Sequence, residues 1–146
     1  MDKASFFSRF FAWLLDGIAV ALLPLIFGCF CGGIFFFVGI GSDSNFLSVL
    51  TGIAAFLLIL ILFLFQFFYF GYFWSRNGQS LGMKMLSMKV VRRNNEEMTF
   101  IRSALRGTLG YYISGLIFGL GYLWALIDAN NETWHDKIFD TWVVRA

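Results

Sequence analysis

Charge is scarce in this sequence and almost absent from its first half. Asp, Glu, Lys and Arg make up 14% of the 146 residues, against about 25% in an average soluble domain. Between Phe10 and Ser75, Asp16 and Asp43 are the only charged residues, and no histidine occurs there. Hydrophobic residues reach 59%, which is more apolar surface than a soluble domain of this size can bury. We therefore predict an integral membrane protein.

Residue types that build metal, redox or nucleophilic sites are equally rare. The chain has two cysteines and one histidine. Cys29 and Cys31 form a C-x-C pair inside an apolar run, closer together than zinc ligands usually are, and we interpret them as apolar filler. The net charge of +2 provides no basic footprint for nucleic acid. We expect no cofactor, no metal, no nucleic-acid partner and no enzymatic activity.

Three apolar segments, at about 10–40, 46–74 and 108–126, predict an all-α integral membrane fold. A crossing helix needs about twenty apolar residues. The first segment exceeds this length, and Pro24 is expected to kink it. It has no cleavage site, so we expect it to be retained as a helix. The third segment is rich in glycine; we favour a single crossing, with a re-entrant pair of half-helices as the alternative.

Basic residues concentrate in the loop at 75–107, which predicts the orientation of the chain. The loop carries two glutamates and seven basic residues, a net charge of +5: Arg76, Lys84, Lys89, Arg92, Arg93, Arg102 and Arg106. Such loops stay in the cytoplasm. The short polar turn at 42–45 has no Lys or Arg and is expected outside, so the N-terminus, with Lys3 and Arg9, is expected in the cytoplasm. We also expect the loop to contact anionic lipids of the bilayer.

The same loop predicts a small β-hairpin. Residues 88–92 and 98–100 flank a polar turn at 93–97. A two-stranded hairpin is marginal alone, and the apolar run 141–144 resembles a further strand. That strand can join only if the third segment returns to the cytoplasmic side. A single crossing, which we favour, places it outside.

Arg9 and Asp16 are seven residues apart, so they share one face of a helix. A carboxyl group in the hydrocarbon core must be protonated, paired with a cation or hydrated. Asp16 is therefore either a proton or cation site or a structural polar link between helices. Arg9 is its expected partner, and Gln66, Arg106 and Asp136 are further partners that either residue can find on another segment.

Acidic residues recur every four positions near the C-terminus, at Asp128, Glu132, Asp136 and Asp140. On a helix they would form a cation-binding strip. The alternative, which we favour, is an irregular solvated tail. His135 is expected to be a surface or packing residue.

The order of several short motifs resembles the RDD family, which is named for one Arg and two Asp. The matching stretches are Arg9-x2-Ala12-x3-Asp16, Gly78-Gln79-Ser80-Leu81-Gly82, Arg106, His135-Asp136-Lys137 and Thr141-Trp142-Val143-Val144. The resemblance covers nearly the whole chain as one domain, 1–146. Two departures are Met83, where the family has lysine, and Asp140, where it has a small residue. Met83 argues against a functional lysine at that position, and Asp140 argues against tight backbone packing before Thr141.

The resemblance implies that Arg9, Asp16 and Asp136 are the namesake residues, and it adds Arg106. Gln66, Asp128 and His135 are secondary candidates. The family implies a small transporter or cation/proton exchanger of the bacterial cytoplasmic membrane. The alternative is a non-transporting scaffold that recruits partners through the basic loop.

Gly28-x3-Gly32 and Gly115-x3-Gly119 permit close helix packing. Three short segments hardly enclose a pathway, so we expect a homo-oligomer or a membrane partner. The alternative is that these small residues pack helices of the same chain together.

Overall fold

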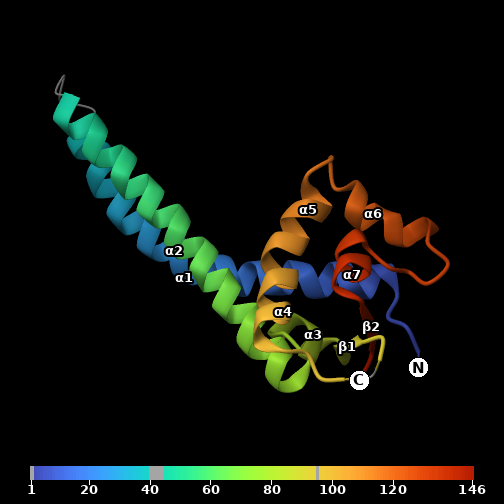
Figure 1. Cartoon of the computed structure of the whole chain (residues 1–146). Coiled ribbons are helices and arrows are strands. Elements are labelled where there is room, and N and C mark those ends of the chain that lie inside the picture. Colours follow the sequence, from blue (N-terminus) through green and yellow to red (C-terminus); the bar gives the residue numbers. More distant parts are fainter. Residues whose placement is uncertain (1, 40–44, 95) are drawn as a thin grey trace.

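The computed structural model describes residues 2–39, 45–94 and 96–146, which are mostly helical. The elements are α1 (Phe6–Gly39), α2 (Asn45–Asn77), α3 (Leu81–Met85), β1 (Met88–Arg92), α4 (Phe100–Leu105), the π-helix η1 (Arg106–Gly110), α5 (Tyr111–Gly115), α6 (Leu120–Ile127), α7 (Trp134–Phe139) and β2 (Thr141–Arg145). The long helices α1 and α2 form an extended arm, and the shorter elements form a compact end beside the first turns of α1 (Figure 1).

Helix α2 is long and apolar enough to cross a membrane. The qualifying stretch is Phe46–Asn77, and none of its most apolar window is buried inside the chain. Its 32 residues extend roughly 48 Å, more than the roughly 30 Å of a bilayer core. Exposed apolar side chains along such a length are stable in lipid and costly in water. Helix α2 therefore has length to spare to reach the compact end.

Helix α1 packs against α2 within the same chain. A Cβ at Gly28 would lie 3.1 Å from Leu58, so this glycine permits close approach of the two helices. That contact supports the intramolecular interpretation of a small residue at this position. The side chains of Cys29 and Cys31, and the polar turn predicted at 42–45, fall almost wholly outside the described residues.

The sheet joins parts of the chain that are far apart in sequence. β1 and β2 pair antiparallel, with Met88 opposite Arg145 and Arg92 opposite Thr141. An isolated bridge adds Lys3 to the other side of β2. The N-terminus, the basic loop and the C-terminus therefore meet at one end of the molecule (Figure 1).

The predicted local hairpin had the wrong second strand. Thr99 does not pair with β1; its side chain accepts a hydrogen bond from the Arg102 amide and caps α4. Val90 of β1 and Val143 of β2 are both buried in the same core. Pairing β1 with β2 buries apolar surface that a local hairpin would leave exposed.

The third apolar segment is bent, which differs from the straight single crossing predicted at 108–126. Helices α4, η1 and α5 continue from Phe100 to Gly115, and α6 leaves at 89° to them. Phe118 and Gly119 have φ values of 48° and 75°, in the left-handed region that ends a helix. Since β2 must return to β1, the expectation that the C-terminus lies opposite the basic loop is wrong.

Candidate functional site

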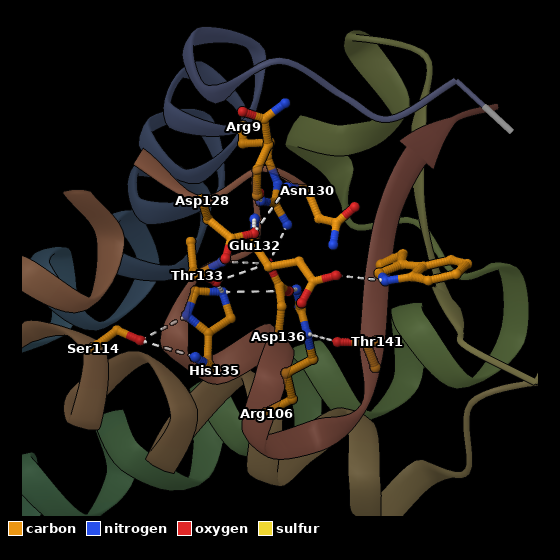
Figure 2. A network of polar contacts seen from close by, with 12 residues as sticks. Arg9, Arg106, Ser114, Asp128, Asn130, Glu132, Thr133, His135, Asp136 and Thr141 are labelled. Atoms are coloured by element: carbon orange, nitrogen blue, oxygen red, sulfur yellow. Dashed lines mark hydrogen bonds and ion pairs between the residues drawn. The ribbon is translucent and has the colours of Figure 1, made fainter. Parts of the chain in front are cut away.

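Asp136 lies at the centre of a buried polar network in the compact end (Figure 2). It is the third residue of α7, where its carboxylate accepts bonds from the Thr133 amide at 3.1 Å and hydroxyl at 2.8 Å. This capping box fixes the side chain at the start of the helix. Arg106 Nη2 donates to Oδ1 at 2.5 Å, and Arg9 Nη2 donates to Oδ2.

The two guanidinium groups keep Asp136 ionised. Burial alone would raise the pKa of this carboxyl. Arg9 and Arg106 outweigh burial, and they hold the pKa of Asp136 well below its ordinary range. The side chains of Arg106 and Asp136 are 1% and 0% exposed, so this is a buried ion pair whose partners depend on each other.

Arg106 links its own element to three others, which are α7 through Asp136, β2 and α2. It is the first residue of the π-helix η1, and Nε donates to Thr141 Oγ1 on β2 at 3.0 Å. Its Cζ lies 4.5 Å from the centroid of the Trp74 ring on α2, within the range of a cation–π contact. Nη1 is buried and has no hydrogen-bond partner within the described part of the chain.

His135 is buried beside this network and is neutral at pH 7. Nδ1 lies 2.8 Å from Ser114 Oγ, and Nε2 lies 2.9 Å from Thr133 Oγ1. Burial lowers the pKa of His135 to about 3, although Asp136 opposes this. The interpretation as a packing residue is consistent with this position, whereas a surface position is not.

Asp16 forms a second, separate junction. Its Oδ1 accepts bonds from Tyr69 Oη at 2.9 Å and from the Gly82 amide at 2.8 Å. Its Oδ2 accepts from Ser80 Oγ at 2.5 Å. A Cβ at position 82 would lie 2.2 Å from the Ala12 carbonyl oxygen, so glycine is required for α3 to approach α1 this closely.

The predicted pairing of Arg9 with Asp16 is therefore wrong, and the alternative considered from sequence, in which Arg9 finds Asp136 on another segment, is the one observed. The two residues share α1, but two turns separate them by about 10.8 Å along the axis. Arg9 instead reaches Asp136, 127 residues away, and Asp16 binds neutral donors. Each residue joins α1 to a different part of the compact end.

The secondary candidates have structural contacts of their own. Gln66 Nε2 donates to the Gly107 carbonyl at 2.8 Å, which links α2 to η1. Asp128 accepts from Lys137 Nζ at 2.5 Å. This hydrogen bond from Lys137 lowers the pKa of Asp128 to about 2. Both residues hold segments together, and Asp128 belongs to the turn before α7.

The four regularly spaced acidic residues form neither a strip nor a solvated tail. Helix α7 is only six residues long, so the period of four does not place them on one face. Glu132 is buried and accepts from Arg93 at 2.6 Å and from Trp142 Nε1 at 2.8 Å. Arg93 also contacts Asp140 at 3.2 Å.

Several residues of the two junctions were missed from sequence. They are Tyr69, Ser80, Glu132, Thr133 and Thr141. Sequence signals existed for three of them. Ser80 and Thr141 lie in stretches that resemble the family, and the Thr133-x-x-Asp136 spacing carries a capping-box signal ahead of α7.

Comparison with known proteins gives a family match over nearly the whole chain. A model of the RDD family matches residues 3–140. This chain belongs to the RDD family. The protein named "Uncharacterized protein YxaI" from Bacillus subtilis (strain 168) is 27% identical over 151 residues, covering 99% of each chain. No solved structure matches.

Membership of the RDD family confirms the predicted resemblance, and with the apolar helix α2 it makes this chain a membrane-associated protein. The namesake residues expected in this RDD protein, Arg9, Asp16 and Asp136, occupy the two junctions described above. Arg9 and Asp136 share one of them with Arg106, and Asp16 holds the other.

A cavity of about 300 Å³ lies against the Asp136 network. Most of its wall is apolar and comes from α1, α5, α6 and the turn between α5 and α6. Its polar lining residues include Arg9, Arg106, Thr133 and His135. Among the described residues, no group of three or more His, Cys, Asp or Glu is placed to hold a metal ion.

Proposed function

We propose that this RDD-family chain is a multi-pass protein of the cytoplasmic membrane that binds and moves a charged solute, and that the cavity beside Asp136 is its solute site. One observation carries the proposal: a cavity of about 300 Å³ that combines apolar walls with two arginines. Pockets that take small organic ligands start near this size, and they combine apolar walls with a few placed polar groups.

The orientation is part of the same proposal. The basic loop, the N-terminus and the C-terminus lie on the cytoplasmic side. The positive charge of the loop supports this assignment, and the pairing of β1 with β2 and the bridge from Lys3 keep all three segments together.

Asp16 is a less suitable solute site than the cavity. Its two oxygens already accept three hydrogen bonds from neutral donors, and it is 1% exposed. A cation bound there would have to displace at least one of these donors. We therefore assign Asp16 a structural role, which is the second of the two roles considered from sequence.

Reconstitution into liposomes tests the proposal. One assay imposes a sodium or potassium gradient and follows protons with an entrapped pH-sensitive dye. A second follows the transbilayer movement of fluorescent phosphatidylglycerol. We expect activity in at least one assay. Leu123→Trp should abolish it because Leu123 lines the cavity. Leu126→Trp on the same helix is the matched control, because Leu126 is exposed outside the cavity lining.

A scaffold remains the second candidate, and one observation favours it. The described residues include one helix that can cross a membrane, α2. A second span is present if the bent pair, Phe100–Gly115 with Leu120–Ile127, is taken as one crossing. So few spans do not enclose a pathway in a single copy, which also favours a homo-oligomer or a membrane partner. No movement in either assay, together with a stable partner in detergent, would replace transport by scaffolding.

A further inference from the structure

The polar floor of the cavity carries an excess positive charge. Arg9 and Arg106 both line it, and Asp136 is the one carboxylate that pairs with both of them in the described structure. His135 adds no charge, because burial keeps it neutral at pH 7. Arg9, Arg106 and Asp136 together carry a net charge of +1, and excess charge held out of water is costly unless an anion compensates it. The floor is therefore suited to a negatively charged group.

The rim of the same cavity is apolar and open. Phe118 is 100% exposed, and Trp13 and Leu123 are 41% and 46% exposed. In a membrane protein, exposed apolar side chains of this kind face lipid. A ligand that enters past them must itself tolerate the hydrocarbon phase.

A second hollow lies along α1 beside this rim. It has a volume of about 290 Å³, and its lining runs from Trp13 to Leu25 and includes Gly17. Trp13 belongs to the lining of both hollows. The twelve residue steps from Trp13 to Leu25 extend about 18 Å. This is close to one leaflet, which is half of the roughly 30 Å hydrocarbon core.

We propose that the two hollows together bind one anionic amphiphile. Its carboxylate or phosphate head group lies against Arg9 in the field of Arg106, and its acyl chain follows the apolar track on α1 past Gly17. A neutral lipid would leave the positive charge of the floor uncompensated. This inference rests on the proposed function because it takes the same cavity as the binding site.

Thermal unfolding of the full chain in a non-ionic detergent tests the ligand class. The probes are oleate, oleoyl lysophosphatidate, the neutral monoolein and inorganic phosphate. We expect oleate, oleoyl lysophosphatidate or both to raise Tm, and monoolein and inorganic phosphate to have little effect. A response to oleate alone identifies a free fatty acid, and a response to lysophosphatidate alone identifies a phospholipid head group. An equal shift with monoolein, or with inorganic phosphate, would overturn the proposal.

Two glycine substitutions test the path of the ligand's acyl chain at positions where an added Cβ meets no neighbour. A Cβ at Gly17 or at Gly52 meets nothing within 4 Å, and both residues lie within helices. Gly17→Leu places a side chain in the track on α1, whereas Gly52→Leu places one on α2. Excluding about two methylenes of the ligand should weaken binding of the responding anion about tenfold in Gly17→Leu. Gly52→Leu should bind like the unsubstituted protein.

Equal affinity of Gly17→Leu and Gly52→Leu for the responding anion would show that its acyl chain does not follow α1, and would overturn the proposal. The outcome is separable from that of the transport assays. If Leu123→Trp abolishes proton exchange but no amphiphile binds, the proposed function holds and the ligand inference fails. Amphiphile binding without movement in either liposome assay removes transport and leaves the ligand assignment.

Discussion

Replacing Arg106 by leucine removes one of the two cations that compensate the buried Asp136 carboxylate. The lost contacts are the 2.5 Å bond to Asp136 and the 3.0 Å bond to Thr141. Breaking one side of a buried ion pair costs about 3–5 kcal/mol. Arg9 and Thr133 still contact the carboxylate, so we expect the free energy of unfolding to fall by about 3 kcal/mol, the lower end of that range.

The double variant Arg106→Leu/Asp136→Leu should be less destabilised than the sum of the two single variants. We expect a coupling energy of about 2 kcal/mol, as for residues in one ion-pair network. Unfolding by increasing fractions of denaturing detergent, followed by tryptophan fluorescence, measures all four proteins. Trp74 is a suitable reporter because its ring lies over the Arg106 guanidinium.

The exposed pair Arg92–Glu96 provides a matched control of the same chemistry. Its side chains are 20% and 62% exposed, and exposed pairs of this kind contribute about 0.2–1 kcal/mol. A coupling between Arg106 and Asp136 no larger than that of this control would refute the argument that burial makes the first pair interdependent.

Three further predictions follow from burial, close packing and strand pairing. The pKa of His135 falls from 6.5 to about 3 on folding, so the unfolded state binds one more proton in this window. The free energy of unfolding should therefore fall by about 1.4 kcal/mol per pH unit as pH drops from about 6.5 to about 4.5. Denaturation curves at several pH values measure this slope, and a His135→Asn variant that retains it would contradict its attribution to His135. Gly82→Ala should destabilise the protein by about 1–3 kcal/mol because its Cβ meets the Ala12 carbonyl oxygen at 2.2 Å; unchanged thermal unfolding would disagree. Cysteines introduced at Asn94 and Arg145 should react with an impermeant thiol reagent from the same side of the membrane, because β1 pairs with β2, and labelling from opposite sides would contradict that pairing.

The sequence alone was sufficient for the features that depend on local composition. The apolar segments at 10–40 and 46–74 correspond to α1 and α2, because a long apolar run favours a helix wherever it meets lipid. The order of short motifs identified the RDD family, which the family match confirms. Arg9, Asp16, Arg106 and Asp136 were recognised from the same motifs, and each of them lies in a polar junction.

The tertiary structure alone decided which of these residues meet. Helical periodicity placed Arg9 and Asp16 on one face, but it contains no information on partners more than 100 residues away. Arg9 contacts Asp136, and Asp16 contacts Ser80, because the packing of the compact end brings α3 against α1 and places Asp136 of α7 within reach of the Arg9 side chain. Strand pairing has the same origin: β1 selects the distant β2 because both bury apolar side chains in one core. Partner choice is a property of the folded chain, since buried charges and strand edges are satisfied by whatever lies nearest in space.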